Sequence, residues 1–406
     1  MGRYMRFMDA QETAYAYDFW SALWAVSSVC SRLTYVARPR APIYLNMYTV
    51  LIGESGVPRK TTSVNMASRL VRDALIRERT VGFIDAKMTP EKLDDILHER
   101  TLEHGCAELC VAIPELAVFL GTERYVATMP TLLTDLYDCP SHRHGGGTIA
   151  RGECIQRNVW LSFLSASTPV WLLKTVNPNV VEGGFTSRCM FINTNLPKHR
   201  IAWPSDSDVD AERAELLQDL RDIRTQAKTS EPIRLTDAGM SAFTKWYNKR
   251  AHSYEIFKQS FEAREDSHVL RVAALLCIND GTWVIDAPHI RVAVELVTTV
   301  KVTSATLFEG GEHRTKYATA LDCVRSTLVS AGMDPVPRST LFRKSRRGLT
   351  TEELEDLLRI LHEVGAVQHF VAPHENGLGR PAQYYRGTQL LLARGLGDQV
   401  LERFSL

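Results

Sequence analysis

Hydrophobic residues recur along the chain at two different spacings. In the first 45 residues they return every three or four positions, which predicts a helix facing a core; these positions are Tyr15, Phe19, Leu23, Val26 and Val29. The run Arg38–Pro42 contains two prolines and breaks this pattern. We therefore expect residues 1–45 to form an N-terminal helical segment that leads into the first strand of a larger core.

Between residues 46 and 200, short apolar runs alternate with helical patterns. The expected strands are Met47–Ile52, Val81–Ile84, Leu109–Ile113, Val159–Leu164 and Cys189–Asn193. The expected helices are Lys60–Arg72, a helix from Thr89 to about Arg100, and a short helix from Pro114. Thr89 is placed to cap its helix, with Pro90 at the first helical position. The alternation predicts an α/β core with a parallel sheet, which binds ligands at the carboxyl ends of its strands.

After residue 200 the pattern changes to one that is mostly helical. Residues 201–312 are expected to form a helical lid, and His268–Cys277 is its most apolar helix. Residues 313–390 contain a helix, a short basic segment and another helix, followed by two strands around a glycine-bearing loop. This order is typical of a winged helix-turn-helix, and residues 391–406 remain as a tail.

Composition limits the class of protein. The 406 residues are 45% hydrophobic and 23% charged, as in ordinary globular domains, and the net charge of +1 means that any nucleic-acid contact depends on local patches. No apolar run approaches the ~20 residues of a membrane span, and the first residues lack the apolar core of a secretory signal. We expect a cytoplasmic protein with no membrane partner.

The segment Gly53–Thr62 carries the strongest chemical signal. It reads Gly-Glu-Ser-Gly-Val-Pro-Arg-Lys-Thr-Thr between an expected strand and an expected helix. Such a loop wraps its backbone amides around phosphates, while a lysine reaches the β- and γ-phosphates and a hydroxyl binds Mg²⁺. The nucleotide-binding candidates are Gly53, Ser55, Gly56, Arg59, Lys60, Thr61 and Thr62, with Thr61 as the Mg²⁺ ligand. The loop is one residue longer than usual and has Arg59 where glycine is usual, so an ordinary turn before a helix is the alternative.

A phosphate loop that hydrolyses ATP also needs an acid, and Glu115 follows the expected strand Leu109–Ile113. It is the candidate for polarising the attacking water. Pro114 stands where a metal-binding aspartate is usual. The alternative for Glu115 is an acid that favours the start of a helix through the helix dipole. Ser165 and Ser167 are sensor candidates after the next strand, although Ser167 or Thr168 can equally cap a helix.

A single arginine and a basic run complete the candidate functional residues. Arg188 follows the glycine turn Gly183–Gly184 and is the candidate arginine finger, which would stabilise the transferring phosphoryl group of a neighbouring subunit; an ordinary ion pair is the alternative. The DNA-binding candidates lie in a basic run without acids and are Arg338, Arg343, Lys344, Arg346 and Arg347. A solvated surface is the alternative for that run.

Cys139, His142, His144 and Cys154 raise the question of a zinc site. They lack a paired Cys-x-x-Cys spacing, and three glycines follow His144 at once. We expect a loop or hairpin tip there.

Taken in order, these segments resemble the RecA-like, AAA+-type ATPase domain of phage- and plasmid-borne replication helicases, which are often fused or paired with a primase. The likeness spans Tyr15 to Arg386. It rests on the phosphate loop, Thr89–Leu93, Ile113–Leu116, Ser165–Thr168, Phe185 with Arg188, His268–Ala274 and Gly379–Arg386. The resemblance implies a hexameric ring that uses ATP and Mg²⁺ to move on DNA, with Lys60, Thr61, Glu115 and Arg188 in the roles given above.

We therefore expect an ATP-dependent DNA helicase or translocase of a phage or another mobile element, acting in DNA replication. Its partners would be single- or double-stranded DNA, further copies of itself and a separate primase or other replication protein. The main alternative is an ATP-switched DNA-binding adaptor or initiator with little hydrolysis, which Pro114 favours. A metabolic kinase is a weaker alternative because the lid and the winged helix would then lack a purpose.

Overall fold

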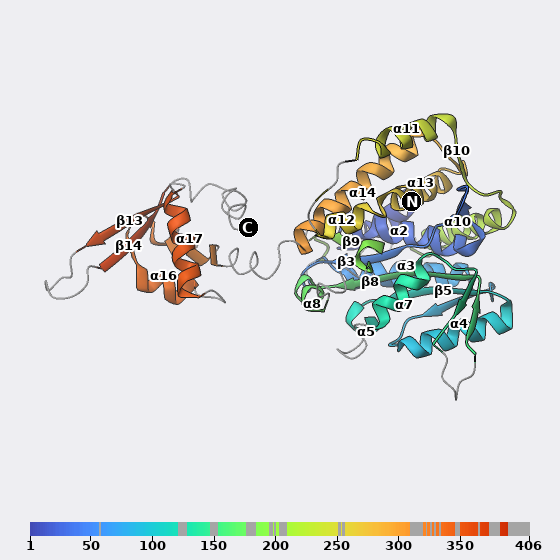
Figure 1. Cartoon of the computed structure of the whole chain (residues 1–406), viewed down its shortest axis with the longest axis horizontal. Helices are drawn as coiled ribbons and strands as arrows, with labels where there is room; N and C mark the ends of the chain where they lie inside the picture. The colour runs from blue at the N-terminus through green and yellow to red at the C-terminus, as the bar shows by residue number, and fades with distance from the viewer. Residues whose placement is uncertain are drawn as a thin grey trace. The chain divides into compact units, whose positions relative to one another are not determined.

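A computed structural model covers the chain and divides it into two compact units, Met1–Glu309 and Gly310–Leu406 (Figure 1). The residues that the structure describes are 1–56, 58–120, 128–146, 153–175, 184–194, 198, 200–202, 209–250, 253, 256–308, 320–321, 323–324, 327–328, 330–332, 334–345, 350–363, 366–372 and 382–388. The first unit contains the expected N-terminal segment, core and nearly all of the expected lid range. No helix in these described ranges is both long enough and apolar enough to cross a membrane.

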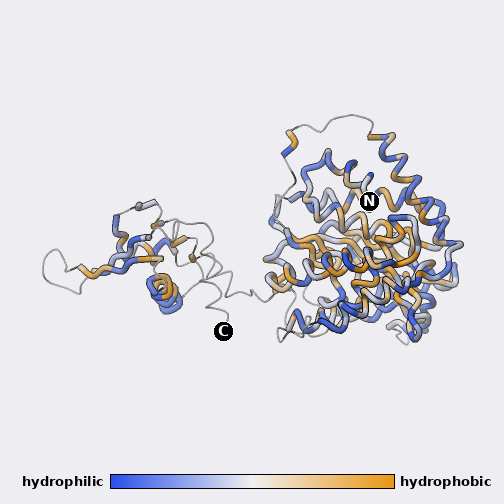
Figure 2. Tube along the Cα trace, turned by 90° about the horizontal axis from the view of Figure 1, so that it is seen from above, coloured by the Kyte–Doolittle hydropathy of each residue, from blue (hydrophilic) through white to orange (hydrophobic). Residues whose placement is uncertain are grey.

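The first unit is built on a parallel sheet of five strands in the order β4-β5-β8-β3-β9. The strands are β3 (Tyr48–Ile52), β4 (Val81–Ile84), β5 (Ala107–Ile113), β8 (Val159–Ser167) and β9 (Cys189–Asn193). Every residue of β3, β5 and β8 is buried, which explains their continuous apolar runs, since a parallel sheet is covered on both faces. Figure 2 shows these hydrophobic segments at the centre of the unit. The predicted parallel α/β sheet is confirmed.

Helices cover the two faces of this sheet. The chain leaves β3 for the edge strand β4 and then returns through β5 and β8, so right-handed crossovers place α3 (Lys60–Ala74) and α4 (Pro90–His104) on opposite faces. Helix α3 packs against α2 (Tyr15–Cys30) and α10 (Val209–Thr229), whereas α4 packs against β5 and lies with α5 (Leu116–Leu120) and α7 (Thr128–Tyr137) on the lower side in Figure 1. A reversal of chain direction of this kind opens a ligand crevice at the carboxyl ends of the strands.

The expected cap of α4 is confirmed. The Thr89 hydroxyl accepts a hydrogen bond from the backbone N–H of Lys92 at 3.2 Å, and Pro90 is the first helical residue.

Two short hairpins extend the sheet region. The first joins β1 (Tyr35–Val36) to β2 (Ile43–Tyr44), where the sequence predicted only a break after a helix. The second joins β6 (His142–His144) to β7 (Ile155–Arg157), so the expected hairpin near Gly145 is confirmed. Asp94 of α4 holds this second hairpin through Arg143 Nη1 at 2.6 Å and the Gly146 amide at 3.0 Å. Among the described residues no group of three or more His, Cys, Asp or Glu side chains is arranged to hold a metal.

The remainder of the first unit is mainly helical, as expected. Its elements are α1 (Gly2–Met8), η1 (Ser31–Leu33), α8 (Pro169–Thr175), η2 (Thr186–Arg188), β10 (Arg234–Leu235), α11 (Asp237–Tyr247), α12 (Ile256–Glu262), α13 (Glu265–Asn279), β11 (Val284–Ile285) and α14 (Ala287–Phe308). Helix α13 packs between α14 and α2, and α14 covers the edge strand β9. The apolar character of His268–Cys277 therefore reflects burial on several sides.

The second unit contains a three-stranded antiparallel sheet in the order β12-β14-β13. Its elements are β12 (Val336–Pro337), α16 (Arg338–Ser345), α17 (Thr351–Glu363), β13 (Val367–Ala372) and β14 (Ala382–Gly387). Helix α17 begins with a capping box, because the Thr350 hydroxyl accepts from the Glu353 N–H and the Glu353 carboxylate accepts from the Thr350 N–H. The expected basic helical segment, the helix after it and the two expected strands are present, while much of the expected helix before them lies outside the described residues. Strand β12 was missed because a two-residue strand leaves no periodic signal.

Candidate functional site

A cavity of about 720 Å³ lies at the carboxyl ends of β3, β5 and β8. Most of the predicted nucleotide-binding and catalytic residues line it: Ser55, Gly56, Arg59, Lys60, Thr61, Thr62, Glu115 and Ser167. Pro114, Ala117, Ala166, Thr168 and Trp171 complete its wall. Segments separated by more than 100 residues in the sequence therefore meet at the edge of the sheet where an α/β fold binds ligands.

The two glycines of the phosphate loop serve different physical purposes. A Cβ on Gly53 would lie 2.4 Å from the Tyr17 hydroxyl and 2.6 Å from the Thr194 carbonyl oxygen, so only glycine fits between them. Gly56 has a φ of +82° with open space around it, so glycine is favoured there by backbone conformation rather than by packing. Gly53 fixes where the loop starts, and Gly56 lets it turn back toward α3.

The positive charge of the cavity comes from Lys60 and the start of α3. Lys60 Nζ donates to the carbonyl oxygens of Gly53 at 2.6 Å and Glu54 at 2.8 Å, and partial burial lowers the pKa of this ammonium. The side chain of Arg59, before α3, makes no capping hydrogen bond, and the Thr62 N–H donates to the Arg59 carbonyl at 3.0 Å. The N–H groups of Lys60 and Thr61 are the ones that the helix start offers to an anion. A lysine held by carbonyls beside free helix amides suits a phosphate group, which would replace those carbonyls as the partner of Nζ.

Arg59 accounts for the departure from the usual loop sequence. Its backbone lies in the left-handed region, with φ 43° and ψ 45°, where glycine is the favoured residue. Its guanidinium forms an ion pair with Glu12, outside the loop. A hydrogen bond from the Ile201 N–H, followed by this arginine, lowers the pKa of Glu12. The loop therefore keeps the conformation that glycine usually supplies, and the arginine side chain ties it to the N-terminal segment.

The donor set fits a nucleoside triphosphate better than it fits a protein-bound metal. Thr61 and Glu115, the residues predicted to serve the Mg²⁺ ion and the attacking water, both line the cavity. Pro114 also lines it and offers no ligand at the position where a second acid is usual. Mg²⁺ prefers an octahedral shell of oxygen atoms and usually keeps several waters. Thr61, the phosphates and water would therefore hold the ion.

The two sensor candidates are placed differently. Ser167 lines the cavity, and its carbonyl oxygen accepts a hydrogen bond from the Gly53 N–H at 3.3 Å. Ser165 is buried outside the lining, and its hydroxyl donates to the carbonyl of Ile113 at 2.7 Å, which ties β8 to β5. The Thr168 hydroxyl accepts from the Trp171 N–H at 3.3 Å, as a helix cap does. The geometry brings Ser167, but not Ser165, to the cavity beside the phosphate loop.

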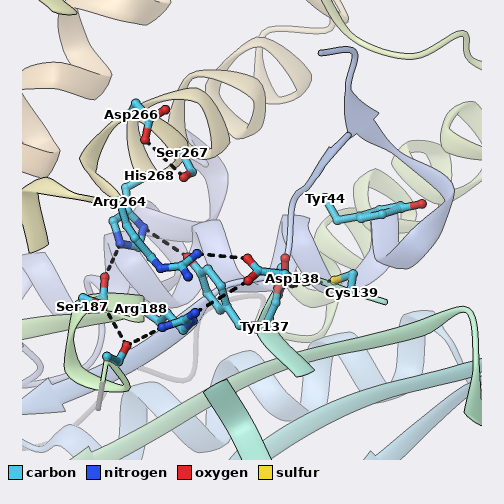
Figure 3. A network of polar contacts seen from close by, with 12 residues as sticks. Tyr44, Tyr137, Asp138, Cys139, Ser187, Arg188, Arg264, Asp266, Ser267 and His268 are labelled. Carbon is cyan, nitrogen blue, oxygen red and sulfur yellow. Dashed lines mark hydrogen bonds and ion pairs between the residues drawn. The ribbon is translucent and has the colours of Figure 1, made fainter. Parts of the chain in front are cut away.

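Arg188 lies at the opposite end of the sheet from Lys60. It immediately precedes β9, which runs parallel to β3 with Cys189 beside Tyr48, whereas the phosphate loop follows the last residue of β3. Five strand residues at ~3.3 Å each separate the two ends by roughly 16 Å. Arg188 is buried, donates to the Gly184 carbonyl at 2.8 Å and lies 3.6 Å from a carboxylate oxygen of Asp138 (Figure 3). It therefore does not line the cavity beside the phosphate loop of its own chain.

Two buried residues behind the phosphate loop were not singled out from the sequence. The Tyr17 hydroxyl lies 2.5 Å from the carbonyl oxygen of Ile52 and 2.6 Å from that of Thr194, at the end of β3. The Asp18 carboxylate accepts from Ser63 in the first turn of α3 at 2.8 Å and pairs with Lys198 at 2.8 Å. Burial raises the pKa of this carboxyl. Asp18 could have been singled out from the sequence, because it is an acid inside an otherwise apolar helix.

The basic run of the second unit is only partly available to a ligand. Arg338 forms an ion pair with Glu355 of α17 and lies over the ring of Phe342 at 4.2 Å. Arg343 and Lys344 are exposed on the last turn of α16. Arg346 and Arg347 lie outside the described residues.

Another cavity, of about 520 Å³, lies between α1, α2, α10 and α13. Most of its lining is apolar, and its charged side chains are the acids Asp219 and Asp222, so it does not suit a phosphate. Comparison with known proteins adds no assignment: no family model matches the chain, and no curated protein matches it significantly.

Proposed function

We propose that this protein is an ATP-dependent DNA helicase or translocase that works as a ring of identical subunits. The observation that carries the proposal is the convergence of Lys60, Thr61, Glu115 and Ser167 on one cavity at the carboxyl edge of a parallel sheet. These residues supply a phosphate-binding cation, a Mg²⁺ ligand, a base for the attacking water and a polar group near the γ-phosphate.

A ring is favoured because Arg188 lies at the far end of its own sheet. An arginine at that end can reach a nucleotide only in a second copy of the chain, where it would stabilise the charge that develops on the transferring phosphoryl group. To do so it would exchange its contacts with Gly184 and Asp138 for the neighbour's phosphates. Hydrolysis would then depend on assembly.

DNA contacts would come from both units. The hairpin β6–β7, held to α4 by Asp94, would carry a glycine-bearing tip toward a strand in the centre of a ring. The second unit would act as a winged helix, and Arg343 and Lys344 are its exposed candidates for phosphate contacts. Helices α10–α14 would form the lid.

The second candidate function is an ATP-switched DNA-binding adaptor or initiator with little hydrolysis. The specific observation in its favour is Pro114, which lines the cavity where a metal-binding acid is usual. With fewer ligands for Mg²⁺, binding of ATP would be preserved better than its cleavage.

The test is ATP turnover with and without single-stranded DNA, for the wild type, Glu115→Gln and a control, Glu91→Gln. Glu91 lies in the first turn of α4, as Glu115 lies before α5, but it does not line the cavity. We expect DNA to stimulate the wild type and the control, and Glu115→Gln to bind ATP without turnover. Turnover that stays at background in the wild type with DNA present, together with tight ATP binding, would favour the adaptor.

The ring is tested separately by mixing Lys60→Ala with Arg188→Ala. Each mutant ring alone has one defect in every site, whereas mixed rings contain some sites with an intact Lys60 facing an intact Arg188. We expect each variant alone to be inactive and the mixture to recover part of the wild-type turnover. If Arg188 serves only as an ion-pair partner within its own chain, mixing restores nothing.

A further inference from the structure

A second charged cavity, of about 560 Å³, lies at the amino end of the sheet. The exposed loop of the hairpin β1–β2 forms one wall, and the end of α7 and the start of α13 form the other; the lining residues that matter here are Arg38, Arg40, Tyr44, Tyr137, Asp138 and Arg271. The Val159 N–H donates to the carbonyl of Pro140, three residues after the end of α7. The end of α7 therefore lies beside the first residue of β8. The cavity is therefore at the opposite end of the strands from the phosphate loop.

Arg271 is the unusual feature of this cavity. It is only 5% exposed, and its guanidinium donates to the Tyr44 carbonyl and to the Tyr137 hydroxyl, both at 2.8 Å. Both acceptors are neutral, and Arg271 forms no ion pair with any described residue. A buried guanidinium that lacks a carboxylate is costly unless another anion balances it.

The neighbouring acids are already engaged elsewhere. Asp138 forms its ion pairs with Arg188 at 3.6 Å and Arg264 at 3.1 Å, and Figure 3 shows both guanidinium groups directed at that one carboxylate. Asp266 pairs with Arg38. Glu265, at the start of α13, pairs with Lys301.

Arginines therefore outnumber acids around the cavity. Arg188 and Arg264 share Asp138, and Arg38 pairs with Asp266. The two remaining arginines of the cavity, Arg40 and Arg271, form no ion pair with a described residue. Arg32 adds another guanidinium 4.3 Å from the centre of the Tyr44 ring.

A chain of hydrogen bonds joins this cavity to Arg188. Arg271 donates to the Tyr137 hydroxyl, which lies 3.3 Å from His268 Nδ1. His268 Nε2 lies 2.8 Å from the Ser187 carbonyl (Figure 3). Because a carbonyl only accepts, Nε2 carries the proton and Nδ1 accepts from Tyr137. Tyr137 and neutral His268 therefore connect Arg271 to the backbone beside Arg188.

We infer that the cavity between the β1–β2 loop and α13 is a phosphate-binding site, in which Arg38, Arg40 and Arg271 hold the phosphate group of a nucleotide or of a nucleic-acid strand. Guanidinium groups bind phosphate oxygens through parallel N–H donors, and two prolines restrict the loop that carries Arg38 and Arg40. The site is separate from the phosphate loop and does not depend on the proposed hydrolysis.

The experiment uses the full chain with Lys60→Ala, which removes the phosphate-loop lysine and leaves this cavity intact. Thermal unfolding is measured with sodium pyrophosphate, with ATP and with an all-thymine single-stranded oligonucleotide. A ligand that binds here, at about 100 times its Kd, should raise the Tm by roughly 5 °C. Adding Arg38→Ser and Arg40→Ser should remove this rise. The matched control adds Arg234→Ser and Arg291→Ser, two exposed arginines outside the cavity, and should keep it.

The ligand arms identify the source of the phosphate. A rise with pyrophosphate and ATP indicates a nucleotide, and a rise with the oligonucleotide alone indicates a nucleic-acid strand. Arg271→Gln is a second variant, which removes the charge from the α13 side and should also abolish the rise. The inference is overturned if no ligand raises the Tm, if Arg38→Ser with Arg40→Ser keeps the full rise, or if the control loses as much as that double variant. Each of these results is independent of whether the wild type hydrolyses ATP.

Discussion

The two ends of the five-stranded sheet both carry positive charge, but they hold it in different ways. At the carboxyl end, Lys60 and the first turn of α3 lie in one continuous segment, and the lysine is only partly buried against loop carbonyls. At the amino end, the arginines come from a hairpin loop, η2 and α13, and Arg188 and Arg271 are buried.

The difference shows what each arrangement requires. A half-buried lysine keeps part of its exposure to solvent, so neutral carbonyls are sufficient partners until an anion binds. Buried guanidinium groups have lost their water and need a partner at all times. Asp138 partners Arg188 and Arg264 within the chain, while Arg271 has only neutral acceptors. At the carboxyl end, the lysine can therefore exchange its carbonyl partners for an anion. At the amino end, the acids of the chain balance only part of the positive charge.

The largest expected effect separates the two ends directly. Lys60→Ala should lower ATP turnover by roughly 10²–10³-fold, because a preorganised cation on the transferring phosphate is lost. DNA-stimulated phosphate release measures it, and Lys87→Ala, an exposed lysine outside the cavity, is the control. If Lys60→Ala retains wild-type turnover, the carboxyl end is not the catalytic end.

The next effect tests how the carboxyl end is built. Gly53→Ala should reduce the free energy of unfolding by about 3 kcal/mol, because the new methyl group would overlap the Tyr17 hydroxyl and the Thr194 carbonyl. Chemical denaturation measures the change. Tyr17→Phe combined with Gly53→Ala should recover part of the loss, since the closest clash at 2.4 Å is with the hydroxyl. No recovery would mean that the backbone carbonyl alone excludes a side chain.

The pH dependence of the free energy of unfolding tests the amino end of the sheet. Burial, with Arg271 next, lowers the pKa of His268 to about 3. In the unfolded chain this histidine titrates near ~6.5. Between these values the unfolded state binds the proton and the folded state does not, so stability falls as the pH drops. At pH 5 the loss due to His268 should be about 2 kcal/mol relative to pH 7.

His268→Gln preserves a donor and an acceptor in place of the two ring nitrogens. Denaturation at pH 7 and pH 5 should show a smaller acid loss for this variant, by about 2 kcal/mol. An unchanged acid loss would mean that His268 is not held neutral.

The smallest effect returns to the carboxyl end. Arg59→Gly should raise the free energy of unfolding by about 1 kcal/mol, because glycine adopts the left-handed conformation without strain. The exposed ion pair with Glu12 offsets only a part of this gain. Denaturation curves of Arg59→Gly and Glu12→Gln separate the two contributions. Destabilisation by Arg59→Gly beyond that of Glu12→Gln would show that the arginine stabilises the loop in another way.

Local patterns determined the sheet and the phosphate-loop cavity. The strands Val81–Ile84 and Cys189–Asn193 and the cap at Thr89 follow from residues that are neighbours in the chain. The position of the loop Gly53–Thr62 could be predicted for the same reason, since the strand, the turn and the start of the helix are consecutive in the chain. Glu115 and Ser167 could be placed because parallel strands end at the same edge.

Only the tertiary structure decided the rest. The hairpin β1–β2 was missed because two-residue strands carry no periodicity. Ser165 does not line the cavity because its hydroxyl donates to the Ile113 carbonyl of β5. The amino-end cavity unites residues from Arg38 to Arg271, and no local signal marks them as partners. Hydrophobic period and turn chemistry act between neighbours in the chain, whereas the burial of a charge and the acid that balances it depend on which distant segments fold against each other.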